Sequence, residues 1–227
     1  MRQRWSEQTI LDAAVELLSC SEGDDLFSMR KLAAALGTDS SSLYRHFRNR
    51  TELMLAIVDH VLVQAMRGYR RQGTWRARLV DLTLRSWDAY AALPQLAKDT
   101  GHYPGSGPGS RLVIEETLQA LGDAGVPEEL VPEWYHRLVT LSVSLISTHA
   151  AGQSCGPTEQ KRRLETFRVI TLGADPADFP ALAHYSRRIE PVGFTRESFL
   201  ATVELVLDAV PTHQERNGTR PSSPEGS

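Results

Sequence analysis

A run of side chains that can bind nucleic acid lies a fifth of the way along the chain. Hydroxyl, guanidinium and imidazole groups can bond base edges or phosphate oxygens, and arginine is the commonest partner of guanine. Because these groups are contiguous here, they predict one surface that contacts DNA, with Ser40 and Arg45 contacting bases. The run comprises Ser40, Ser41, Ser42, Tyr44, Arg45 and His46.

Three short helices are expected to position this run. Apolar residues at helical spacing predict a first helix over 6–19 and a second that begins after Ser28. Gly37 can take the left-handed conformation that ends a helix, and Asp39 offers a capping oxygen to a third helix, Ser40–Phe47. A second and third helix joined by so short a turn are what a helix-turn-helix requires, since the third presents its N-terminal residues to the major groove.

The wording of this segment resembles the tetracycline-repressor-like (TetR) family. The resemblance rests on the run Leu-Tyr-Arg-His-Phe-Arg-Asn-Arg and covers residues 6–62 closely; it continues more weakly to about residue 210. It implies a DNA-binding transcription regulator with a C-terminal domain of the tetracycline-repressor type. Ser40, Ser41 and Arg45 depart from the tetracycline repressors proper, so a different operator is expected. The resemblance implies contacts to DNA, chiefly phosphate, from Ser28, Arg30, Tyr44, His46 and Arg50.

The remainder of the chain predicts an all-α fold. A long amphipathic helix is expected over 52–69, and no segment favours a strand. We expect a DNA-binding domain over 1–50, an effector-binding and dimerisation domain over 51–210 linked to it by helix 52–69, and a disordered tail over 211–227. Residues 101–110 are rich in glycine and proline and predict a loop. Further helices are expected at about 75–92, 94–98, 111–123, 133–151, 158–172, 179–185 and 195–210.

Two helices, at about 133–151 and 195–210, carry apolar residues on nearly every side. A helix of this kind must be buried on more than one side. We therefore expect them to pack across a twofold axis in a homodimer, which would place two DNA-contacting helices about 34–36 Å apart on a palindromic operator.

A small-molecule effector site is expected in the interior of the larger domain. Aromatic and hydroxyl groups there suit a largely apolar pocket with a few polar groups, although such residues are more often plain core. Effector binding is expected to act on helix 52–69, which carries the DNA-contacting helices. The candidate residues are His60, Trp87, Tyr90, His102, Tyr103, Thr140, Ser144 and Ser147.

Composition excludes several other classes. A net charge of −3 argues against bulk coating of nucleic acid, and Cys20 and Cys155 have no spacing that frames a zinc site. We expect no metal and no cofactor. No apolar window of about 18 residues is present, so the protein is expected to be cytoplasmic, without a membrane partner.

Three alternatives remain open from sequence. A helical enzyme could pair His136 with Glu133, but no nucleophile, phosphate loop or acid pair accompanies them. A ligand-independent architectural DNA binder would explain the first 69 residues without explaining so large a second domain. A repressor released from its operator by a small molecule is the expected function, with a ligand-independent or activating regulator as the alternative.

Overall fold

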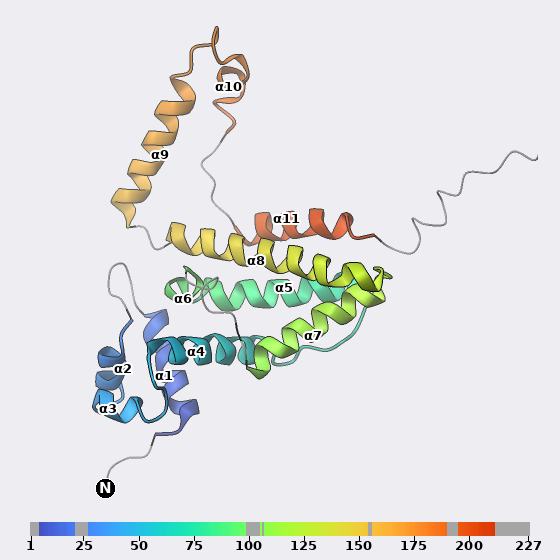
Figure 1. Cartoon of the computed structure of the whole chain (residues 1–227). Coiled ribbons are helices and arrows are strands. Elements are labelled where there is room, and N and C mark those ends of the chain that lie inside the picture. The colour runs from blue at the N-terminus through green and yellow to red at the C-terminus, as the bar shows by residue number, and fades with distance from the viewer. Residues whose placement is uncertain are drawn as a thin grey trace, which may run out of the picture.

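The computed structural model describes residues 5–20, 27–98, 105, 107–153, 156–189 and 195–211. Every regular element in those ranges is a helix, which confirms the predicted all-α class (Figure 1). His102, Tyr103 and nearly all of the tail predicted to be disordered lie outside the described residues. The helices are α1 (Glu7–Ser19), α2 (Met29–Ala35), α3 (Ser40–Leu43), α4 (Arg50–Ala65), α5 (Trp75–Ala91), α6 (Pro94–Lys98), α7 (Pro108–Asp123), α8 (Val131–Gln153), α9 (Pro157–Leu172), α10 (Pro180–Tyr185) and α11 (Arg196–Asp208), with a short 3-10 turn at Glu128–Leu130 before α8.

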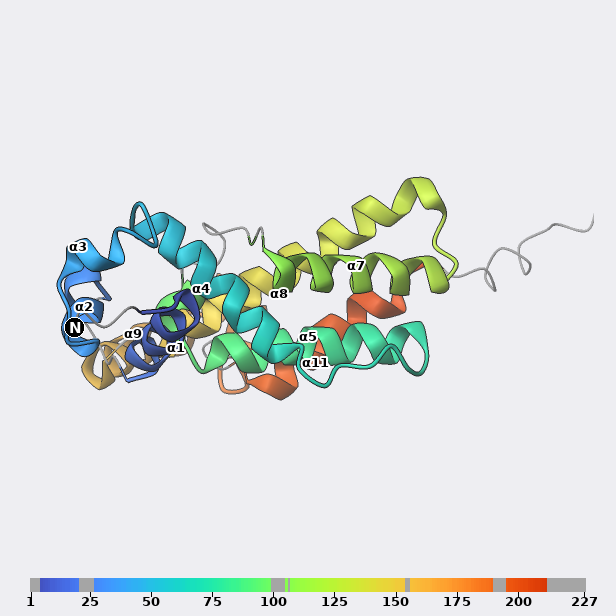
Figure 2. The ribbon, with the colours of Figure 1, turned by 90° about the horizontal axis from the view of Figure 1, so that it is seen from below.

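Helices α1 to α3, together called the head, form one end of the molecule (Figure 2). Ser6 and Ser28 cap α1 and α2 by accepting the backbone N–H three residues on. Gly37 ends α2 with φ +64°, a conformation that glycine adopts without steric cost. Ile10, Leu32 and Leu43 are completely buried, so one apolar centre holds the three short helices together.

Helix α4 joins the head to the body. Six of its apolar side chains and two polar ones are buried, so α4 is covered on nearly every side, by the head and by the rest of the molecule. In the rest of the molecule, called the body, α5, α8 and α11 lie side by side, and α7 packs against α5 and α8 and also against α4 (Figures 1 and 2). No helix among the described residues is both long enough and apolar enough to cross a membrane.

Helix α9 extends away from the body and carries α10 at its far end (Figure 1). Val169, Ile170 and Phe179 on this arm are 74%, 63% and 57% exposed. Nothing within the described part of the chain covers these three side chains.

Three predicted boundaries were wrong for local reasons. Helix α3 ends at Leu43 instead of Phe47, and Tyr44 to His46 form a turn, because the chain must leave the helix before Asn49 caps α4. Helix α4 spans Arg50–Ala65, because Asn49 begins it sooner than predicted and it ends before Gly68, which has φ +76°. Helix α7 begins inside the predicted loop, at Pro108, since proline is well suited to the first helical position.

Candidate nucleic-acid interface and ligand cavity

The N-terminus of α3 is organised by one carboxylate. Asp39 Oδ1 accepts the Ser42 backbone N–H at 2.8 Å, and it also accepts the hydroxyls of Ser41 and Ser42. Arg45 Nη2 in turn donates to Ser42 Oγ at 3.0 Å. Asp39 therefore holds Ser41 and Ser42 in place. Through Ser42 it also positions Arg45, which we expect to contact bases. The hydroxyl oxygens keep lone pairs that can accept bonds from DNA.

The predicted DNA-contacting residues share one property: all are at least partly accessible. Tyr44 is 49% exposed, so it does not belong to the core of the head, whereas its neighbours Leu43 and Phe47 are buried. The hydroxyl of Ser28 is partly engaged as the cap of α2, where it accepts the Lys31 N–H at 3.3 Å. Exposed side chains are Arg30, Ser41, Tyr44, Arg45 and Arg50, and half-buried ones are Ser28, Ser40, Ser42 and His46.

The turn into α4 is closed by a reciprocal pair. Asn49 Oδ1 accepts the Glu52 N–H at 2.8 Å, and Glu52 Oε2 accepts the Arg48 N–H at 2.7 Å. Each side chain thus satisfies a backbone donor that the helix start leaves unpaired. These two bonds therefore fix where α4 begins, with Arg50 as its first residue.

Two adjacent polar residues in the middle of α4 contact opposite parts of the molecule. Asp59 Oδ1 accepts the backbone N–H of Ser110 at 2.9 Å and its hydroxyl at 3.1 Å, so it caps the start of α7, where Gly107 has no side chain to do so. His60 Nε2 lies 3.0 Å from Asp12 Oδ1 on α1. Residues 59 and 60 therefore tie α7 and the head to the same turn of α4.

A cavity of about 290 Å³ lies between α4, α5, α7 and α8. Its wall is largely aliphatic, and Tyr90 and Tyr135 supply the aromatic groups. Burial raises the pKa of the Tyr135 phenol, which therefore stays protonated near neutral pH. The side chains that α8 contributes follow one helical stripe: Tyr135, Leu138, Val139, Ser142, Val143 and Ile146.

Of the predicted effector residues that the structure describes, Tyr90 alone lines this cavity. Trp87 is buried elsewhere, with its ring 4.3 Å from that of Phe199 and 4.7 Å from that of His149, and His60 faces α1. Thr140 and Ser144 are exposed on the opposite side of α8 from the cavity stripe. Ser147 donates to the Lys98 carbonyl at 3.0 Å. Two of the helices that carry the expected residues, α5 and α8, line this cavity, but these particular residues do not, and their role in effector binding stays a prediction.

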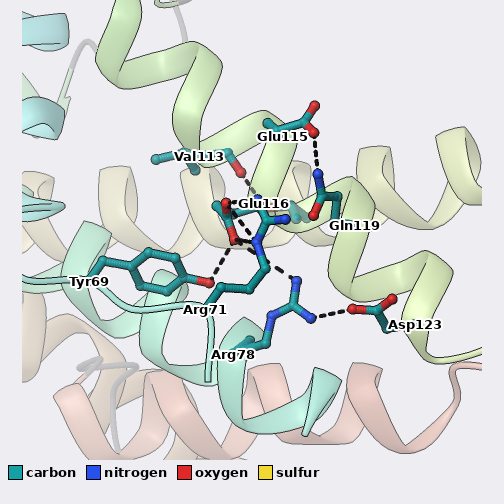
Figure 3. A network of polar contacts seen from close by, with 9 residues as sticks. Tyr69, Arg71, Arg78, Val113, Glu115, Glu116, Gln119 and Asp123 are labelled. Carbon is teal, nitrogen blue, oxygen red and sulfur yellow. Dashed lines mark hydrogen bonds and ion pairs between the residues drawn. The ribbon is translucent and has the colours of Figure 1, made fainter. Parts of the chain in front are cut away.

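A polar network joins the α4–α5 connection to α7 (Figure 3). Glu116 on α7 is 3% exposed, and its carboxylate accepts from Arg71 Nε at 3.0 Å and from the Tyr69 hydroxyl at 3.1 Å. Arg78, 5% exposed, pairs with Asp123, and its Nη2 lies 3.9 Å from Glu116 Oε2. The Arg71 guanidinium, more than any other neighbour, lowers the pKa of Glu116.

Sequence reasoning missed Asp59 and Glu116, although both left a signal. Asp59 interrupts the apolar run Ile57 to Leu62, and Glu116 falls on one stripe of α7 with the partly buried Val113 and the buried Ala120. A charge at a stripe position needs a partner, which indicates an ion pair or a cap. Among the described residues, no group of three or more histidine, cysteine, aspartate or glutamate side chains could hold a metal ion.

A helix-turn-helix head on an all-helical body with a cavity is the architecture of a class of DNA-binding regulators of transcription. Residues 10–57 match the bacterial regulatory proteins of the tetR family, and residues 68–213 match the tetracyclin repressor-like C-terminal domain. The chain belongs to the tetR family. Its members and the relatives below are regulators of transcription and not enzymes.

Three relatives illustrate this likeness. The HTH-type transcriptional repressor DrrR1 of Streptomyces coeruleorubidus is 31% identical over 124 residues, 54% of this chain and 46% of that protein, so the match spans about half the length of each. A candidate transcriptional regulator of Streptomyces coelicolor A3(2) is 47% identical, with a TM-score of 0.78 over 92% of this chain and 98% of that one. ActR of Streptomyces coelicolor, solved in complex with actinorhodin, is 22% identical with a TM-score of 0.76 over 92% and 97%, a likeness of fold.

Proposed function

We propose that this protein is a homodimeric repressor that binds a palindromic operator and leaves it when a small molecule fills the cavity between α4, α5, α7 and α8. The division into a DNA-binding part over residues 1–50 and an effector and dimerisation part over 51–210 is included in this proposal. The observation that carries it is the middle of α4, where Asp59 contacts the wall of the cavity and His60 contacts the head. One rigid helix thus joins a ligand cavity to a DNA-contacting surface.

The outer faces of α8 and α11 support the dimer. Thr140, Ser144 and Thr148 are exposed at four-residue spacing on α8, and such small side chains allow a second helix to approach closely. On α11, Leu205 is 69% exposed. A four-helix contact across a twofold axis would cover both faces and pair two heads on one side. Sedimentation equilibrium measures the assembly directly, and a monomer at micromolar concentration would contradict this part of the proposal.

The release mechanism follows from the contacts of α4. A ligand that displaces the first turn of α7 also moves the carboxylate of Asp59, because this group accepts two bonds from Ser110. Helix α4 then shifts, and the pair His60–Asp12 transmits the shift to α1. Ligand and DNA act on one equilibrium. Operator DNA must therefore lower the affinity for the ligand by the same factor by which the ligand lowers the affinity for operator DNA.

The first mutational prediction concerns base recognition. Arg45→Ala is expected to weaken operator binding about tenfold and to relax the preference at one base pair of each half-site, because a bidentate arginine contact contributes on that order. Selection of binding sites from a random DNA pool, followed by titration of the selected duplex, measures both quantities.

Arg111→Ala is the matched control, since Arg111 is an exposed arginine on α7, outside the head. An unchanged base preference in Arg45→Ala would refute the role of this residue.

Operator binding that no cavity ligand weakens would favour the ligand-independent regulator, and a ligand that strengthens binding or transcription would favour an activator.

A further inference from the structure

Seven residues that line the cavity carry a hydroxyl group, and four of these groups donate their proton to acceptors within the protein. Thr83 Oγ1 donates to the Leu79 carbonyl at 2.6 Å and Ser86 Oγ to the Leu82 carbonyl at 2.9 Å, both within α5. Thr117 Oγ1 donates to the Val113 carbonyl at 2.7 Å. Ser110 Oγ donates to Asp59 at 3.1 Å.

A hydroxyl has one proton and two lone pairs, so each of these groups keeps only acceptor capacity for a ligand. They belong to α5 and α7 on two walls of the cavity. Beside these four oxygens, a ligand group that can only accept, such as an ether or ketone oxygen, would find no donor and would lose its bond to water. A ligand hydroxyl or N–H would instead be satisfied by them.

The charges around the cavity select in a second way. No Asp, Glu, His, Lys or Arg is among the described residues that line it. A charge lies directly behind the wall at the Asp59 carboxylate, which is 9% exposed and bonded to the lining residue Ser110. A ligand anion would be desolvated against aliphatic side chains and would meet this negative charge.

We propose that the cavity binds a neutral, mainly apolar ligand that carries hydrogen-bond donors, of which an aromatic molecule with phenolic hydroxyls is the simplest chemical class. This inference rests on the proposed function, in which the cavity is the effector site. Its volume of about 290 Å³ lies near the lower end of the range for ligand pockets. Small rigid molecules, such as those of two rings, are therefore suitable probes.

The test uses matched probes on two frames, naphthalene and biphenyl, each as the diol, the dimethyl ether and the dicarboxylate. Calorimetric titration of the full chain near neutral pH is expected to rank the diol first on each frame, about tenfold above the ether, with the dicarboxylate weakest. Equal or tighter binding of the ethers or dicarboxylates, or no binding of either diol to protein that still binds DNA, would overturn the proposal.

Variants show whether the preference arises at these oxygens. Thr83→Val and Thr117→Val remove one acceptor each at nearly constant shape, and each is expected to weaken the diol roughly threefold to tenfold while the ether is unchanged or tighter. Thr171→Val is the control, because Thr171 makes the same bond, to the Phe167 carbonyl at 2.9 Å, away from the cavity. Unchanged diol affinity in both cavity variants would place the diol elsewhere and refute the assignment.

The two proposals fail in distinguishable ways. A protein that binds operator DNA but shows no preference for diols refutes the ligand class and leaves the regulator intact. A protein that prefers diols, with the loss expected in Thr83→Val, but binds no selected DNA refutes the proposed function and leaves the chemistry of the cavity intact.

Discussion

Replacing Glu116 by alanine is expected to lower the free energy of unfolding by about 3 kcal/mol, because it removes the buried carboxylate that Arg71 and Tyr69 bond and leaves the buried guanidinium of Arg78 with Asp123 as its remaining carboxylate. Arg78 is 5% exposed, and its Nε and Nη2 atoms have no hydrogen-bond partner even with Glu116 present. Removing Glu116 also frees the Tyr69 hydroxyl and Arg71 from α7. Urea unfolding at one fixed protein concentration measures the loss.

Glu115→Ala is the matched control one residue away, since Glu115 is exposed and bonds only to Gln119 among the contacts of its side chain that the structure records. It should change stability by less than about 0.5 kcal/mol. Equal losses in the two variants would show that the buried network contributes nothing particular.

The Glu116 variant also predicts a pH dependence. The pKa of Glu116 is lowered from 4.5, mainly by the hydrogen bonds from Arg71. A lowered pKa in the folded state contributes stability above the unfolded value, and this contribution is lost as the pH falls through the folded pKa. The difference in stability between wild type and Glu116→Gln should therefore be constant near neutral pH and shrink below pH 4.5. A difference that grows in acid would contradict the ion pair.

Gly109→Ala is expected to destabilise the protein by about 2–3 kcal/mol, because it forces two packed helices apart. A Cβ at Gly109 would lie 2.6 Å from the backbone oxygen of Asp59 and 2.7 Å from the backbone nitrogen of Val63, and backbone atoms of α4 cannot turn aside as a side chain can. The same displacement would break the cap that Asp59 makes with Ser110. Thermal unfolding measures the first effect, and amide exchange at the start of α7 measures the second.

Gly122→Ala on the same helix is the control. A Cβ there would meet nothing within 4 Å, so alanine should stabilise the helix by about 0.5–1 kcal/mol. Stability that is unchanged or raised by both substitutions would refute the close contact of α4 and α7 and, with it, the route proposed from cavity to head.

The order of the helices could be predicted because each one has its own local signal. Periodic apolar residues, Ser6, Ser28 and Asp39 as caps, and Gly37 as a stop are all readable within a few residues. The end of α3 could not be predicted in this way. It depends on Asn49 and Glu52, because the bonds that their side chains accept from backbone N–H groups fix where the next helix begins.

The head and the cavity differ in how far sequence reasoning reached. Most of the residues predicted to contact DNA are neighbours in the chain, on α3 and the turn that follows it, so their exposure follows from local structure, and the contacts themselves stay a prediction. The cavity is formed by four helices, and its face on α8 depends on how that helix is rotated against α5 and α7. Periodicity could not choose between the stripe of Ser142 and the stripe of Ser144, because both mix apolar and hydroxyl residues.

Binding of the full chain to the intergenic DNA beside its own gene, followed by fluorescence anisotropy over a series of salt concentrations, tests the central claim most directly. We expect saturable binding to a palindromic site with a Kd on the order of 10 nM or tighter and a steep loss of affinity as salt rises. The account would be contradicted if the protein bound this fragment, and duplexes selected from a random pool, with no higher affinity than it binds unrelated DNA.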